Sequence, residues 1–230
     1  MLLELKNVKK QYGSTTVLNV EHLAIDKGEC IGIVGNNGAG KTTAFSLILD
    51  LIQASEGVVL SKEKDVSKTE EWKSYTSAFL DETFLIDFLT PNEYFDFVGG
   101  LHNWTKAEIA EFTQQFEEFF NGEILGVKKY IRDLSKGNQK KVGIVGALIG
   151  NPEIVILDEP FASLDPTTQI RLKKLITDRL DQHTFLISSH DLTHVAEVSN
   201  RVVILEHGNV VMDNEKTSDT IRKMKEYFEV

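Results

Sequence analysis

The sequence is nearly free of cysteine. Its 230 residues include one, Cys30, so an internal disulfide bond is excluded. We therefore expect a reducing cytoplasm as its compartment. Cys30 begins the apolar run CIGIV, which is typical of a buried strand, so it is a poor candidate for a reactive thiol.

A long hydrophobic run is also missing. The longest nearly apolar stretch, at 142–150, is interrupted by glycines and is far shorter than the roughly 20 residues of a membrane helix. Residues 1–10 alternate like a strand and carry charges at Glu4 and Lys6, so we expect no signal peptide. If the protein acts on a membrane, another chain must supply the membrane-spanning part.

Positive charge is in deficit. The chain has 25 lysines and arginines against 35 aspartates and glutamates, which gives a net charge of −10. This balance argues against nucleic-acid binding and against a basic membrane-surface patch. Since 41% of the residues are hydrophobic, the chain can still bury a substantial core. Its length suits one domain, with or without an attached lobe.

What the sequence does contain is a glycine-rich loop, GNNGAGKT at 35–42, which fits the pattern G-x-x-x-x-G-K-[ST] at every defined position. Its glycines let successive N–H groups point at an anion. The apolar run at 30–34 is typical of a buried strand. Residues 42–52 are typical of a helix, whose positive N-terminus would face the loop. The sequence therefore predicts a nucleoside triphosphate site, in which Lys41 reaches the terminal phosphates and the Thr42 hydroxyl ligates magnesium. A chance glycine-rich turn is the alternative.

The rest of the chain predicts an α/β fold. Residues 1–34 alternate and carry turn signals, which indicate a small β region before the loop. Residues 62–72 predict a loop and a short helix. Beyond residue 151, strands and helices alternate, which is typical of a parallel sheet with helical crossovers. We expect further strands at 57–60, 154–157, 184–188 and 202–205, and helices at 169–180 and 194–198.

A helical lobe is predicted in between. In the segment TPNE, Thr90 caps a helix, Pro91 occupies its first position and Glu93 completes a capping box. Farther on, apolar residues recur at helical spacing. They are Ile109, Phe112, Phe116, Phe119 and Phe120. We interpret this phenylalanine stripe as core, with a partner-binding face as the alternative.

An apolar strand at 154–157 ends in two carboxylates, Asp158 and Glu159. This arrangement suits a magnesium–nucleotide site in an open α/β sheet. Asp158 would hold the metal, and Glu159 could orient or deprotonate the attacking water. A solvated acidic turn is the alternative. His190 follows another apolar strand and could contact the γ-phosphate, although a lone histidine is more often structural.

The segment LSKGN precedes an apolar helix that we expect to begin near Gln139. Ser135 and Gly137 at a helix start favour an anion. A plain serine cap is the simpler reading.

Together these motifs resemble those of the ATP-binding cassette ATPases, the motor subunits of ABC transporters, over nearly the whole chain. The phosphate loop is GNNGAGKTT, the signature LSKGN, the acidic strand IVILDEP, the next loop ASLD and the histidine switch SSHD. The resemblance implies one α/β domain, 1–230. It implies a P-loop NTPase core with a mostly parallel sheet, an N-terminal antiparallel β subdomain and an inserted helical subdomain at about 83–145.

The resemblance also implies a role for single residues in binding ATP and Mg²⁺. The implied catalytic residues are Glu159 as the base, His190 as the γ-phosphate switch, and Lys41. Tyr12 would stack on adenine, and Asp158 would hold the metal with Thr42. The phosphate and magnesium contacts are Gly35, Asn36, Asn37, Gly38, Ala39, Gly40, Lys41, Thr42 and Thr43.

In this family the signature acts on ATP held by a second subunit. The resemblance therefore implies a homodimer in which Ser135, Gly137 and Asn138 face the partner's nucleotide and Asp165 couples the two sites. The signature departs from LSGGQ, since Asn138 keeps an amide but is one methylene shorter than glutamine. Hydrolysis should survive this change.

A second departure lies where the family has a loop glutamine. Here FLDE places Glu82, or with a shifted alignment Asp81, at that position. An acid can contact magnesium or its bound water, but it adds negative charge near the triphosphate.

The leading hypothesis is an ATPase subunit that drives a separate integral membrane permease from the inner face of the cell membrane. LSKGN, Glu82 and the compact length look most like cassettes of exporters for antibiotics, peptides or lipids, while import stays open. The alternative is a soluble, non-transport cassette such as an iron–sulfur assembly scaffold. A phosphoryl-transfer kinase would have no reason to carry LSKGN before ILDEP.

Overall fold

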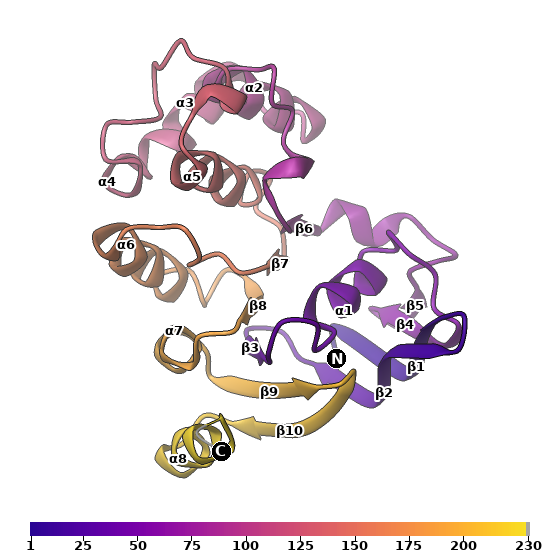
Figure 1. Cartoon of the computed structure of the whole chain (residues 1–230). Coiled ribbons are helices and arrows are strands. Elements are labelled where there is room, and N and C mark those ends of the chain that lie inside the picture. The colour runs from indigo at the N-terminus through magenta and orange to yellow at the C-terminus, as the bar shows by residue number, and fades with distance from the viewer. Residues whose placement is uncertain (229–230) are drawn as a thin grey trace.

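The computed structural model describes residues 1–228, and its strands form one ten-stranded sheet in the order β5-β4-β1-β2-β10-β9-β3-β8-β7-β6 (Figure 1). The strands are β1 (Leu3–Tyr12), β2 (Thr15–Ile25), β3 (Cys30–Val34), β4 (Glu56–Ser61), β5 (Lys64–Asp65), β6 (Thr76–Phe79), β7 (Ile154–Leu157), β8 (Thr184–Ser189), β9 (Arg201–Glu206) and β10 (Asn209–Glu215). The helices are α1 (Lys41–Ile48), α2 (Pro91–Leu101), α3 (Lys106–Gln114), α4 (Glu117–Phe120), α5 (Lys136–Gly146), α6 (Pro166–Thr177), α7 (Leu192–Val198) and α8 (Ser218–Phe228). Short 3₁₀ turns are η1 (Glu71–Ser74), η2 (Glu82–Phe84) and η3 (Ile131–Asp133).

The sheet has two parts. Strand β1 pairs antiparallel with β2 and β4, whereas β6, β7, β8, β3 and β9 run parallel to one another, and β9 pairs antiparallel with β10 on its other side. The predicted parallel core and N-terminal antiparallel region are therefore confirmed. Strand β3 lies between β8 and β9 and is buried at every residue, Cys30 included. Burial on both faces explains why such strands read as unbroken apolar runs.

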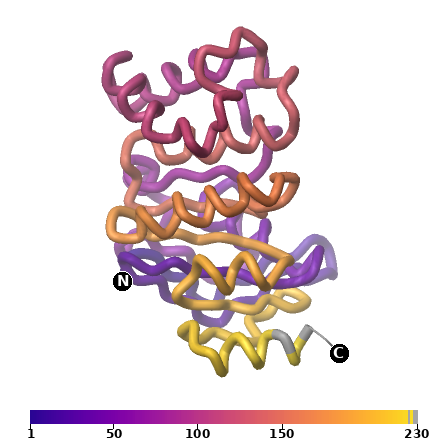
Figure 2. Tube along the Cα trace, turned by 90° about the vertical axis from the view of Figure 1, so that its left-hand side faces the viewer, coloured from indigo at the N-terminus to yellow at the C-terminus, as the bar shows by residue number. Residues whose placement is uncertain are grey.

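Helices α2 to α5 gather in a lobe at one end of the molecule, and α8 lies at the other (Figures 1 and 2). Thr90 and Glu93 form the predicted capping box at the start of α2. The phenylalanine stripe is core, as predicted, because Phe116, Phe119 and Phe120 are buried, and the rings of Phe95 and Phe120 stack at 5.9 Å. The lobe limits 83–145 and the single domain 1–230 remain predictions, and residues 229–230 lie outside the described chain.

Several predicted helix limits were wrong. Helix α1 ends at Ile48 instead of 52, since Asp50 adopts φ 49°, a left-handed conformation that stops a helix. Helix α5 begins at Lys136 instead of Gln139, because Ser135 caps it by accepting from the Asn138 N–H at 3.2 Å. Helix α6 begins at Pro166 instead of 169, where Asp165 is the cap. None of the helices within residues 1–228 combines the length and hydropathy that a membrane span requires.

Replacing Phe120 by alanine should destabilise the lobe, because its ring is fully buried and its removal leaves a cavity. We expect a loss of about 3–5 kcal/mol in the free energy of unfolding, measured by urea denaturation. Phe97→Ala is the control: its ring is 48% exposed, so the change should cost less than about 0.5 kcal/mol. Equal stability of the two variants would contradict the assignment of the stripe to the core.

Candidate active site

A cavity of about 320 Å³ opens at the phosphate loop, between β3 and α1. Most of the residues that line it belong to the predicted loop. They are Val17, Asn37, Gly38, Ala39, Gly40, Lys41, Thr42, Thr43 and Glu159. The structure therefore brings the loop and one of the two predicted carboxylates to the same space. Val17, on β2, was not predicted, because its place here depends on how β2 crosses the loop.

The loop geometry requires glycine at residue 40. Gly40 precedes α1 with φ 108°, a left-handed conformation, and a Cβ atom there would lie 3.0 Å from the Val17 carbonyl oxygen. No side chain caps α1. The first N–H groups of this helix are thus open to an anion in the cavity, where the helix dipole also favours negative charge.

Lys41 is held at the cavity wall. Its side chain is buried, and Nζ donates to the carbonyl oxygens of Gly35 at 2.6 Å and Asn36 at 3.4 Å. The same Nζ lies 3.3 Å from Glu159 Oε1. An incoming phosphate would find this cation already oriented, and would compete with Glu159 for it.

Asp158 is buried between two hydroxyl groups. Thr42 Oγ1 donates to Oδ2 at 2.5 Å, and Ser188 Oγ donates to Oδ1. Burial raises the pKa of Asp158, and these hydroxyls partly offset the rise. A hydroxyl and a carboxylate oxygen suit Mg²⁺, which takes few protein ligands and completes its shell with water and phosphate oxygens. Residues 1–228 contain no group of three or more His, Cys, Asp or Glu side chains that could hold a metal ion by themselves.

Glu159 adopts a left-handed backbone with φ 46°, which costs an L-residue about 1–2 kcal/mol. Its neighbours hold it there. Its N–H donates to Ser188 Oγ at 2.8 Å, its carbonyl oxygen accepts from Lys140 Nζ at 2.8 Å, and Oε2 lies 2.9 Å from His190 Nδ1. Within the described chain, Oε1 is buried and accepts no hydrogen bond, but it is paired with Lys41 Nζ at 3.3 Å. Departure of Lys41 from this contact would leave the oxygen open to a water molecule.

Glu82 does not line the cavity but is joined to it through Lys140, whose Nζ is 3.8 Å from Glu82 Oε1. The Asp81 side chain is engaged locally, because it caps η2 by accepting from the Thr83 N–H at 2.6 Å. Glu82 is thus the acid of the pair that contacts Lys140, and its role at the loop position stays a prediction.

Sequence reasoning missed Lys140 and Ser188. The sequence carries no signal for Lys140, because lysine is common in helices and its burial, with that of Gln139 and Lys141, becomes visible only in the fold. For Ser188 the signal was weak, a serine near the end of an apolar strand.

Other predicted residues lie elsewhere. Tyr12 is 57% exposed at the end of β1, where Lys10 Nζ lies 4.8 Å from its ring centre. Ser135 and Asp165 cap α5 and α6. Gly137 packs near the Ser163 carbonyl oxygen. In the part of the chain that the structure describes, the cavity lining includes none of these residues, nor Asn138.

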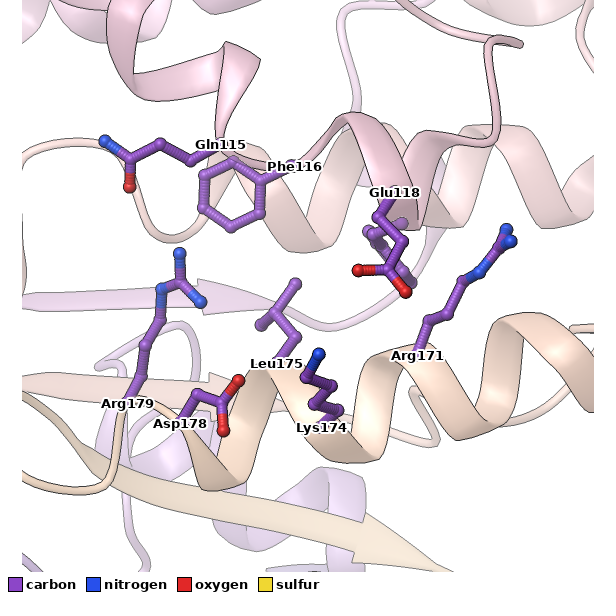
Figure 3. A pocket seen from close by; sticks show the side chains of 9 residues that line it. Gln115, Phe116, Glu118, Arg171, Lys174, Leu175, Asp178 and Arg179 are labelled. Carbon is purple, nitrogen blue, oxygen red and sulfur yellow. The ribbon is translucent and has the colours of Figure 1, made fainter.

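A separate cavity of about 100 Å³ lies between α3–α4 and α6 (Figure 3). Two of its cations are already engaged: Arg171 Nη1 donates to Asn121 Oδ1 at 2.8 Å, and the Arg179 guanidinium lies 4.6 Å from the Phe116 ring centre. We assign no ligand to it.

Comparison with known proteins gives consistent matches. A family model described as ABC transporter matches residues 18–162. An ABC transporter ATP-binding protein of Methanocaldococcus jannaschii is 34% identical over 225 residues, which cover 96% of this chain and 80% of that protein. Another from Synechocystis is 33% identical over 198 residues, or 82% of this chain, and the match covers 54% of that longer protein.

A solved structure described as the ATP binding subunit of an ABC transporter has a similar fold. It gives a TM-score of 0.83 at 26% identity and covers 97% of this chain and 93% of its own.

Replacing Lys41 by alanine should weaken nucleotide binding by about 10- to 100-fold, because hydrogen bonds to charged groups contribute about 1.5–3 kcal/mol. Titration of fluorescent ATP measures the affinity. Lys27→Ala is the control, since Lys27 Nζ pairs with Glu153 at 3.2 Å and its side chain is 72% exposed. If Lys41→Ala binds ATP as tightly as Lys27→Ala, the phosphate site has been misplaced.

Proposed function

The chain belongs to the ABC transporter ATP-binding family, and from this premise we propose that it powers a separate integral membrane permease as one of two cassettes that enclose ATP. Like its family, it binds ATP with Mg²⁺ and hydrolyses it. The observation that carries the proposal is the cavity at the phosphate loop, where Lys41, Thr42 and Glu159 meet.

In the proposed reaction, the α1 N-terminus and Lys41 bind the β- and γ-phosphates. Thr42 and Asp158 would hold Mg²⁺, which when bound neutralises charge on the phosphate oxygens. Lys41 moves from Glu159 to the phosphates, so Oε1 of Glu159 is released to accept a proton from the attacking water. His190, which lies against the other oxygen of Glu159, senses the γ-phosphate.

A second subunit would complete the site. The lining described above comes from the phosphate loop, β2 and the end of β7, and it leaves out the signature residues. We propose that another copy supplies Ser135, Gly137 and Asn138, with Asp165 near the junction of the two sites. Because Ser135 starts α5, the second α5 would direct its N-terminus at the nucleotide.

The proposed permease contact lies beside Glu82. Phe84 and Phe88 are 56% and 62% exposed, and Phe97 on α2 is also exposed. Exposed aromatic side chains are typical of interaction sites. A permease helix bound there would lie next to the Glu82–Lys140 contact. The cassette would then be peripheral on the inner face of the cell membrane.

We also propose a direction of transport, which is export. This proposal rests on the resemblance of LSKGN and Glu82 to the corresponding segments of exporter cassettes. The relatives compared above are named as transporter subunits, so we do not propose the iron–sulfur scaffold.

Glu159→Gln should slow hydrolysis by on the order of 10²-fold, because the general base is lost while the shape is kept. ATP binding should persist, so ATP should trap a dimer that size-exclusion chromatography detects. The same variant with ADP is the control and should stay monomeric. A variant that remains monomeric at saturating ATP would contradict the two-cassette arrangement.

Phe84→Ala combined with Phe88→Ala should abolish stimulation of ATP hydrolysis by the permease, because the apolar contact is removed. The measurement compares hydrolysis with and without the proposed permease, after reconstitution of both in vesicles. Tyr130→Ala, at a position 45% exposed, is the control. Unchanged stimulation in the double variant would place the permease contact elsewhere.

A further inference from the structure

Lys140 is a buried lysine that connects three separate elements. It lies on α5, and its side chain is 8% exposed. Its Nζ donates to the main-chain oxygen of Glu159, just beyond β7, and lies 3.8 Å from Glu82 Oε1 on η2. A buried cation is costly unless it is paired and hydrogen-bonded, so a lysine at this place needs a reason beyond packing.

The charges around Lys140 suggest that reason. Burial lowers the pKa of Lys140, and four carboxylates, Glu82, Glu159, Asp158 and Asp81, partly offset this effect. Bound ATP would add further negative charge and would engage Lys41. Lys140 does not itself line the cavity, and its contacts are the main-chain oxygen of Glu159 and the Glu82 carboxylate, so it stays beside the acids when the cavity fills.

The hydrogen bond to Glu159 has a second effect. The left-handed backbone of Glu159 is disfavoured and must be held by its surroundings. Ser188 binds the N–H of this residue, and Lys140 binds its carbonyl oxygen. Loss of Lys140 would leave that oxygen with the Ala162 N–H, at 3.2 Å, in place of the shorter, charged donor at 2.8 Å. The peptide that orients the carboxylate would then be held less firmly.

We propose that Lys140 is a positioning residue for ATP hydrolysis: it fixes the backbone of Glu159 and neutralises Glu82, so that an acid is tolerated beside the triphosphate. The inference rests on the proposed role of Glu159 as the base. Glu82 replaces the glutamine of the family pattern and adds a negative charge. The buried positive charge of Lys140 compensates for it.

The first test is Lys140→Met, which keeps the length of the side chain and removes its charge and donor. We expect kcat to fall by on the order of 10- to 100-fold, the loss typical of a misplaced catalytic group, while ATP affinity changes little. Lys141→Met is the matched control, because Lys141 is equally buried but pairs with Glu123 at 2.7 Å within the lobe. The control should lower the melting temperature without lowering kcat. Equal kcat in the two variants would overturn the proposal.

The second test is a double-mutant cycle with Glu82→Gln and Lys140→Gln. If the charges compensate one another, the double variant should hydrolyse ATP faster than Lys140→Gln alone. If the two substitutions instead lower the hydrolysis rate independently and additively, the proposal that Lys140 neutralises Glu82 is overturned. The glutamine variants also serve if Lys140→Met does not fold, because an amide can still donate to the Glu159 carbonyl oxygen.

Glu159→Gln separates this inference from the proposed function. If Glu159→Gln hydrolyses ATP at the normal rate, the role of Glu159 is wrong. If Glu159→Gln is inactive and Lys140→Met has normal kcat, the fault lies in the inference about Lys140 alone.

Discussion

The site depends on the register of three neighbouring parallel strands. Val34 at the end of β3 pairs with Ser189 on β8, and Leu157 at the end of β7 pairs with Ile187 on β8. The phosphate loop, the acidic pair and His190 follow the carboxyl ends of these strands, so they lie at the same edge of the sheet. A slip of one residue would turn every side chain of a strand to the opposite face. Since the strands are buried on both faces, such a slip is strongly disfavoured.

Within this frame, two adjacent carboxylates acquire different surroundings. Asp158 lies between the hydroxyls of Thr42 and Ser188, whereas the Glu159 side chain faces Lys41 and His190. Neutral donors leave Asp158 able to bind a metal ion once the hydroxyls rearrange. The left-handed backbone of Glu159 separates the two environments, because it turns the second side chain out of the strand direction.

The parts that could be predicted from the sequence are those whose signals are local. The phosphate loop, the strand before Asp158 and the capping box at Thr90 each follow from neighbouring residues, and each is found as expected. The parts that were missed depend on distant contacts. Strand β6 is a short, partly polar edge strand, and β10 is mostly exposed, so neither has the apolar pattern of a core strand. Lys140 reads as an ordinary helix lysine until the fold brings Glu82 and Glu159 beside it.

The burial of Cys30 has a practical consequence. The thiol lies inside the central strand with no exposed surface, and its pKa is raised by burial to about 12. Thiolate is the form that reacts with maleimides, so at neutral pH Cys30 of the folded protein should not react with these reagents. New cysteines can therefore be introduced and labelled in the natural sequence. A cysteine introduced on the lobe and another on the β subdomain would carry a dye pair, and the distance between the dyes would report domain motion without prior removal of a native thiol.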